Sequence, residues 1–110
     1  VKGNNMKINQ ESIRVDGTHL VGYLNATYDD LTAVLGYPLE DGYDDYKSDA
    51  EWHIEFDNGL VATIYNYKNG KNYLGEDGLN LCDMTQWHVG GRSPEIVARV
   101  AELIPDAVAV

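Results

Sequence analysis

Cationic and aromatic side chains gather in two segments of the sequence that could bind an anionic ligand. Lys68 and Lys71 lie among tyrosines in NYKNGKNYLG, and Arg92 lies in WHVGGRS, just before a predicted helix. Lysine and arginine bind phosphates, the free amides of a helix start bind anions, and aromatic rings stack on bases. The pattern predicts a site for a small nucleotide-like ligand, formed by Tyr65, Tyr67, Lys68, Lys71, Tyr73, Trp87, His88 and Arg92.

The same residues also allow an interpretation without a ligand. Glycines permit tight turns, the two lysines offset neighbouring carboxylates, and Trp87 suits a core position. Neither a Walker loop nor a dinucleotide-binding fingerprint accompanies the two segments. Both interpretations stay open at the level of the sequence.

Patterns that would indicate an enzyme are weaker. The three histidines are far apart and form no H-x-x-x-H or H-E-x-x-H pair for zinc. His53 alternates with Glu51 and Glu55 along a predicted strand, and such a row either positions a base or is the exposed face of the strand. Cys82 has no neighbouring cation that would activate its thiol. We therefore expect a non-enzymatic protein that uses no metal or cofactor.

The charge of the chain is strongly acidic. Eighteen Asp and Glu against eight Lys and Arg give a formal net charge of −10, which argues against direct nucleic-acid binding through phosphates. No apolar run approaches the ~20 residues that span a bilayer, and the polar start VKGNNMKINQ does not resemble a signal peptide. The single cysteine excludes an intramolecular disulfide. These features predict a cytoplasmic protein without membrane contact.

The clearest structural pattern is a β-hairpin over residues 51–67. Trp52, Ile54 and Phe56 alternate with polar residues in EWHIEF, and the β-branched and aromatic run LVATIYNY follows. Asn58-Gly59 tolerates positive φ at both positions and predicts a two-residue type I′ turn. The second run carries apolar residues on both faces, which favours a central strand.

Two helices are predicted from their caps. The Thr27 hydroxyl can accept from the amide of Asp30 and begin a helix that ends at Gly36. Ser93-Pro94-Glu95 combines a capping residue, a first-turn proline and an acid, and it begins a second helix that Pro105 ends.

The remaining patterns complete a small α+β fold. Asp16-Gly17 predicts a second hairpin, and residues 84–89 predict a last strand. We expect a flexible N-terminal leader over residues 1–10 and a single domain over 11–110. The predicted order is β-β-α-β-β-β-α, an antiparallel sheet of about five strands with two helices on one face. Residues 38–49 carry five carboxylates and read as a solvated acidic loop, with weak cation or partner binding as the alternative.

The segments DAEWHIEFDNGLVATIYNYKNGKNYLG, WHVGGRS and LTAVLGYP resemble those of a group of small, uncharacterised proteins encoded by bacteriophages, many of them from marine or other environmental samples. The resemblance covers roughly residues 20–104, and the chain departs from it at LGYPLEDGYDDY, where a simpler Gly-x-Pro turn would be expected. It implies an accessory protein that blocks or sequesters a host factor, without selecting the target.

Three hypotheses for function follow. The first is a non-enzymatic binding protein whose predicted site takes a small anionic ligand or a host protein. The second is an acidic interaction protein that imitates the charge of DNA with carboxylates centred on residues 40–57. The third is a structural homo-oligomer in which the eight tyrosines build an interface, since tyrosine is favoured where a surface must be apolar and hydrogen-bonding.

Overall fold

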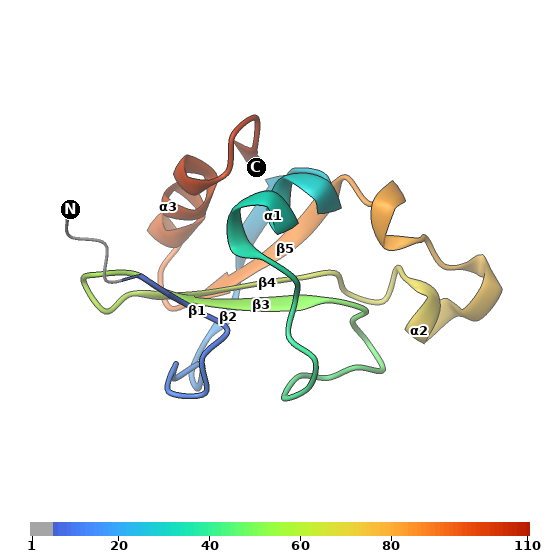
Figure 1. The fold of residues 1–110 in the computed structure, drawn as a ribbon, viewed down its shortest axis with the longest axis horizontal. Coiled ribbons are helices and arrows are strands. Elements are labelled where there is room, and N and C mark those ends of the chain that lie inside the picture. Colours follow the sequence, from blue (N-terminus) through green and yellow to red (C-terminus); the bar gives the residue numbers. More distant parts are fainter. Residues whose placement is uncertain (1–5) are drawn as a thin grey trace.

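A six-stranded antiparallel sheet with the order β1-β3-β4-β5-β2-β6 organises the computed structural model, which describes residues 6–110 (Figure 1). The strands are β1 (Lys7–Ile8), β2 (His19–Asn25), β3 (Glu51–Glu55), β4 (Val61–Tyr65), β5 (Gln86–Gly91) and β6 (Val108–Ala109). The helices are α1 (Tyr28–Leu35), α2 (Lys71–Leu74) and α3 (Glu95–Leu103), with the 3-10 turns η1 (Gly75–Asp77) and η2 (Leu81–Asp83). The predicted α+β class is confirmed, but its elements differ: the two-residue strands β1 and β6 are additional, the strand predicted before Asp16 is not formed, and α2 is a third helix.

Helices α1 and α3 cover the same face of the sheet, while α2 lies beyond the ends of β3 and β4 (Figure 1). The core between helices and sheet is built around two tryptophans, Trp52 and Trp87, whose rings meet edge to face at 5.6 Å. Each indole N–H has a backbone partner, the carbonyls of Gly36 and Ala26 respectively, as a buried indole requires. We call the opposite side of the sheet the second face.

Helix α1 begins and ends as its sequence predicts. The Thr27 hydroxyl accepts from the Asp30 N–H, and the Asp30 carboxylate accepts from the Thr27 N–H, both at 3.0 Å. This reciprocal capping box satisfies two amides that a helix start leaves unpaired. Gly36 adopts a φ of 81° and ends the helix.

The predicted central hairpin is confirmed, and its turn differs from the prediction. β3 and β4 pair from Glu51↔Tyr65 to Glu55↔Val61, and the Phe56 N–H donates to the Leu60 carbonyl. Only Gly59 has positive φ, at 84°. The loop therefore has three residues with Gly59 in the left-handed region, whereas a type I′ turn would need positive φ at Asn58 as well.

Two predictions for the N-terminal part are corrected. Lys7–Ile8 pairs with β3, so the predicted leader over 1–10 contains a strand; its first five residues lie outside the described part of the chain. The Asp16-Gly17 turn forms, with φ 81° at Gly17, but no hairpin surrounds it. Strand β2 pairs with β5 on one side and, at Leu24 and Asn25 only, with β6 on the other, while the residues directly before the turn do not join the sheet.

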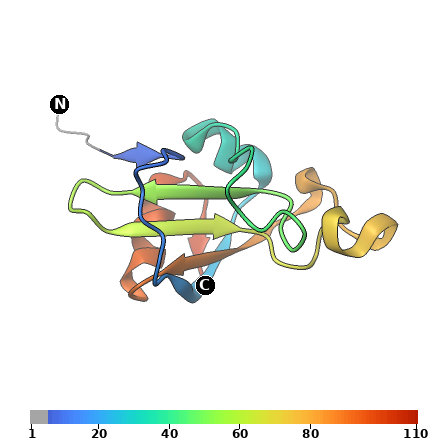
Figure 2. The ribbon, with the colours of Figure 1, turned by 90° about the horizontal axis from the view of Figure 1, so that it is seen from below.

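Residues 9–18 instead run across the second face from β3 to the end of β5, and we call them the crossing segment (Figure 2). The segment is fixed at one end by hydrogen bonds between Asn9 and the backbone of His53, and at the other by Arg92. Ile13 is buried in it. His53, expected on an exposed strand face or as a positioned base, is only 8% exposed, so the first expectation is wrong.

Short segments lie along β3 on one side of the sheet and along the end of β2 on the other. On β3, the two residues of β1 are continued by Asn9, and further along the Leu39 N–H donates to the Glu51 carbonyl at 2.9 Å. On β2, β6 pairs with Leu24 and Asn25. In the described residues, no helix combines the length and apolar character needed to cross a membrane.

Candidate functional site

Alternation along the strands places aromatic and polar side chains on the second face. Trp52, Ile64 and Trp87 point into the core, so their neighbours along each strand point the other way. The register aligns Glu51 with Tyr65, Tyr65 with His88, and His88 with Tyr23. A row from four adjacent strands therefore crosses the sheet on the face without helices.

The rings of this row touch one another and continue into the loop after β4. The Tyr65 and His88 rings stack with centroids 5.4 Å apart, and Tyr23 and Tyr67 approach the same imidazole at 5.0 and 5.7 Å. Lys68 places its ammonium 5.1 Å from the Tyr67 centroid and 5.4 Å from that of Tyr73. Tyr73 in turn meets Tyr46, at 5.1 Å. We call this continuous set the aromatic stripe: Tyr23, His88, Tyr65, Tyr67, Lys68, Tyr73 and Tyr46.

Electrostatics keep the centre of the stripe uncharged near neutral pH. Burial lowers the pKa of His88 below its ordinary 6.5, so the imidazole there is neutral. Burial, and then the neighbouring Glu51 carboxylate, raise the pKa of the Tyr65 phenol above 10.0, so it keeps its proton. The stripe thus presents neutral aromatic surfaces with hydrogen-bonding tips and one cation, Lys68.

The loops that carry the outer half of the stripe are fixed by one buried asparagine, Asn66. Its Oδ1 accepts from the N–H groups of Asp49 and Ala50 at 2.8 and 3.0 Å, and its Nδ2 donates to Asp49 and Asn69. The Ser48 hydroxyl donates to the Asn66 carbonyl. These bonds join the acidic loop to the loop after β4, which is how Tyr46 and Tyr73 come together.

The acidic loop 38–49 is more ordered than a solvated loop. Asp44 Oδ1 accepts from the N–H groups of Tyr46 and Lys47, and the Asn72 amide donates to the carbonyls of Asp45 and Ser48. Throughout residues 6–110, no three His, Cys, Asp or Glu side chains are grouped so that they could hold a metal ion. Of the carboxylates of this loop, those of Asp44 and Asp49 accept hydrogen bonds that order it.

Five of the eight predicted site residues come together in the stripe: Tyr65, Tyr67, Lys68, Tyr73 and His88. The other three lie elsewhere. Trp87 is fully buried on the helix-covered face, as the alternative interpretation of the sequence expected. Lys71 lines a separate pocket with Tyr28 and Leu81, near α1.

Arg92 lies at the far end of the sheet from Lys68. Its guanidinium donates to the carbonyls of Arg14 and Asp16, at 2.7 Å each. The length of β4, about 13 Å for its five residues, separates the two cations. Helix α3 begins at Glu95, close after Arg92, but Ser93 does not cap it as predicted: its hydroxyl donates to the Glu95 carboxylate at 2.8 Å, which puts negative charge at the helix start. The three predicted cations therefore do not converge on one ligand.

Sequence reasoning did not include Tyr23, Tyr46 or Asn66 in the site. Tyr23 and Tyr46 belong to distant segments, and only the strand order and the asparagine network bring them to the stripe. Asn66 reads in the sequence as a loop residue beside a strand. A polar residue directly after a long apolar run was its only available signal.

Comparison with known proteins adds no relative to this description. The chain matches no protein-family model, no curated protein and no solved structure.

Proposed function

We propose that the protein is a non-enzymatic binding module that docks a protein partner on the aromatic stripe. The observation that supports this most is the series of ring contacts that crosses three strands, β2, β5 and β4, on the face opposite α1 and α3, and continues into the segments that carry Tyr67, Tyr73 and Tyr46. Tyrosines of this kind are enriched at binding hot spots because one side chain offers apolar area and a hydrogen bond.

The charge distribution favours a protein over a nucleotide. Of the three predicted cations, only Lys68 could contact a phosphate bound on the stripe, and the Glu51 carboxylate lies there beside Tyr65. The chain as a whole carries a net charge of −10, which repels a polyanion. A protein surface with Lys or Arg side chains would gain from both the tyrosine faces and the nearby carboxylates. The resemblance to phage-encoded accessory proteins makes a host protein the partner that we propose.

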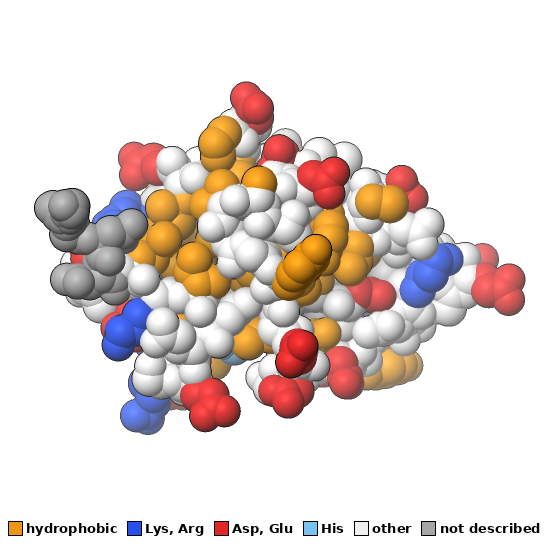
Figure 3. Space-filling view, viewed as in Figure 1, with side chains coloured by type: hydrophobic (Ala, Val, Ile, Leu, Met, Phe, Trp, Pro, Cys, Tyr) orange, Lys and Arg blue, Asp and Glu red, His pale blue; other side chains and the backbone are white. Residues whose placement is uncertain are grey.

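The alternative of DNA mimicry has less support. On the face seen in Figure 3, a few Asp and Glu side chains lie together below the centre and the others are scattered among hydrophobic and neutral surface, without forming a continuous row. A mimic of DNA would gather its carboxylates in a stripe spaced like phosphates.

The test is capture of partners from a host lysate on immobilised wild-type protein and on the variant Tyr67→Ala/Lys68→Asn. Asparagine suits the left-handed backbone of Lys68, φ 59°, so the variant keeps the loop conformation. The matched control is Tyr37→Ala, because this tyrosine is 82% exposed and lies outside the stripe.

We expect a protein that binds the wild type and Tyr37→Ala and that is retained at least tenfold less by the stripe variant, as loss of a hot spot implies. Capture of the same proteins in equal amount by all three forms would refute the proposal. A parallel thermal-shift series with mono-, di- and cyclic nucleotides tests the small-ligand alternative. A rise in melting temperature that is lost when Lys68 is replaced would indicate that the stripe binds a nucleotide and not a protein.

A further inference from the structure

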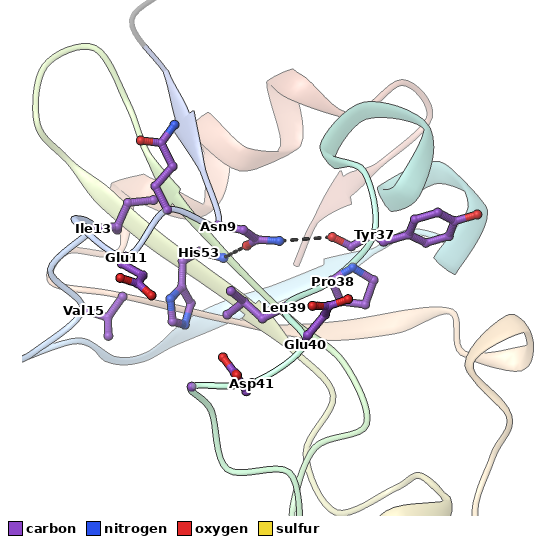
Figure 4. A pocket seen from close by; sticks show the side chains of 12 residues that line it. Asn9, Glu11, Ile13, Val15, Tyr37, Pro38, Leu39, Glu40, Asp41 and His53 are labelled. Carbon is purple, nitrogen blue, oxygen red and sulfur yellow. Dashed lines mark hydrogen bonds between the residues drawn. The ribbon is translucent and has the colours of Figure 1, made fainter.

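A cavity of about 650 Å³ lies on the second face, between the crossing segment and the loop of residues 37–42 (Figure 4). Its size falls within the range of small-molecule sites. Asn9 ties both walls to the sheet: its Oδ1 accepts from the His53 N–H at 2.8 Å, and its Nδ2 donates to the Tyr37 carbonyl at 3.1 Å. The cavity is therefore bounded by fixed backbone.

His53 lies at the base of this cavity and carries a ring nitrogen without a partner. Its Nε2 is 2.7 Å from the Glu51 carboxylate, and no other hydrogen bond reaches the imidazole from the residues that the structure describes. No fully buried side-chain nitrogen or oxygen in that part of the chain lacks a partner, so the unpaired Nδ1 must be open to solvent. The His53 side chain is about nine-tenths buried and lines the cavity, so the cavity is where its ring meets solvent.

The Glu51 carboxylate decides what Nδ1 can do. An ionised carboxylate only accepts hydrogen bonds, so Nε2 of His53 carries the hydrogen between them. In the neutral imidazole the other nitrogen, Nδ1, is then an acceptor directed at the cavity. A neutral imidazole in this arrangement pairs with a ligand that has an N–H or O–H donor.

The walls add negative charge and apolar surface. Figure 4 shows the Glu11, Glu40 and Asp41 carboxylates around the space that the His53 ring enters. No Lys or Arg is among the residues of the described chain that line the cavity. The apolar part of the wall comes from Ile13, Val15, Pro38 and Leu39. Since these carboxylates are not grouped as metal ligands, an organic cation fits them better than a metal ion.

We infer that this cavity binds an aliphatic ammonium or guanidinium group, with an N–H of the cation donating to His53 Nδ1, its charge facing the rim carboxylates and its alkyl stem against Leu39 and Val15. The inference does not depend on the aromatic stripe. The cation belongs either to a small amine or to a Lys or Arg side chain of a polypeptide, and both present the same chemistry.

The test is an NMR titration of protein labelled with ¹⁵N-histidine, with the His53 signals assigned by their loss in His53→Gln. The probes are n-butylammonium, n-butylguanidinium and n-butyltrimethylammonium, of which the last has the same stem and charge but no N–H donor. Nα-acetyl-lysine N-methylamide supplies the polypeptide source of the cation. We expect saturable movement of the His53 Nδ1 signal with the first two probes and at least fivefold weaker binding of the trimethyl compound.

The carboxylate contribution is tested by Glu40→Gln/Asp41→Asn, which leaves the buried His53 untouched. The chain offers a matched control in its second Glu-Asp-Gly sequence, where Glu76→Gln/Asp77→Asn makes the same change on the exposed turn η1. We expect the first variant to weaken n-butylammonium binding about fivefold and the second to leave it unchanged.

Absence of any His53 shift at millimolar probe would overturn the inference, as would equal binding of the butylammonium and trimethyl probes or equal effects of the two carboxylate variants. Tighter binding of the lysine derivative than of n-butylammonium would support the site and identify a polypeptide as the source. Equal or weaker binding would support the site and identify a small amine.

Discussion

Replacement of Asn66 by alanine tests whether one buried amide holds the two loops of the site together. Asn66→Ala removes the acceptor of the Asp49 and Ala50 N–H groups. Ala50 is fully buried, so its unpaired N–H costs about 2 kcal/mol, and the half-buried Asp49 N–H adds about 1 kcal/mol. The expected loss in the free energy of unfolding is therefore about 3 kcal/mol, before any cavity is counted. For a domain of this size the melting temperature should fall by about 10–15 °C.

Urea unfolding followed by tryptophan fluorescence measures this loss, because both indoles are fully buried in the folded state. The matched control is Asn80→Ala, an asparagine in an exposed loop whose amide makes only a 3.4 Å contact with Asp83. We expect the control to change stability by less than about 0.5 kcal/mol. A loss below about 1 kcal/mol for Asn66→Ala, or equal losses for the two variants, would refute the role assigned to the network.

Three further predictions concern the sheet and α1. Because burial lowers the pKa of His88, the unfolded chain takes up a proton there more readily than the folded one, so the free energy of unfolding declines as pH falls below about 6.5. His88→Gln should reduce this decline, measured by urea unfolding at pH 7.5 and 5.5. An unchanged decline in the variant would contradict the reasoning. Gly90→Ala would place a Cβ in steric clash with Thr63 Oγ1 and should cost about 1–3 kcal/mol in the free energy of unfolding, part of which Thr63→Ala restores. Strictly additive losses would contradict this contact. Thr27→Ala should lose about 1 kcal/mol and Thr27→Ser much less, whereas equal losses would show that the hydroxyl is not the cap.

Local patterns predicted the hairpin of β3 and β4 and the capped start of α1, because each depends on residues that are close in sequence. The Asp16-Gly17 hairpin failed for a reason that lies elsewhere in the chain. Strand β2 pairs with β5 and β6, which begin more than 60 residues later, and residues 9–18 cross the second face instead of joining the sheet, so the outcome depends on contacts that no local signal reports. The turn chemistry was right and the pairing was wrong.

The candidate site was likewise predictable from the sequence only where its residues are close along the chain. Tyr65, Tyr67 and Lys68 are neighbours along one run, so sequence spacing was enough to group them. Arg92 was grouped with them by residue type, and the antiparallel register of β4 and β5 places it at the opposite end of the sheet. His53 was recognised as part of a polar row, but the crossing segment that buries it could not be read from alternation.

The occupied edges of the sheet bear on how this protein can diversify. Binding by addition of a strand requires free backbone groups along an edge. β1, Asn9 and Leu39 already use those of β3, and β6 with Val110 uses those of β2 from Tyr23 to Asn25. Along these covered stretches, recognition falls to side chains on the second face, which take no part in the hydrogen-bond ladder. Substitutions there can alter what is bound while the strand pairing is retained, so selection can act on specificity and on folding through largely separate sets of residues.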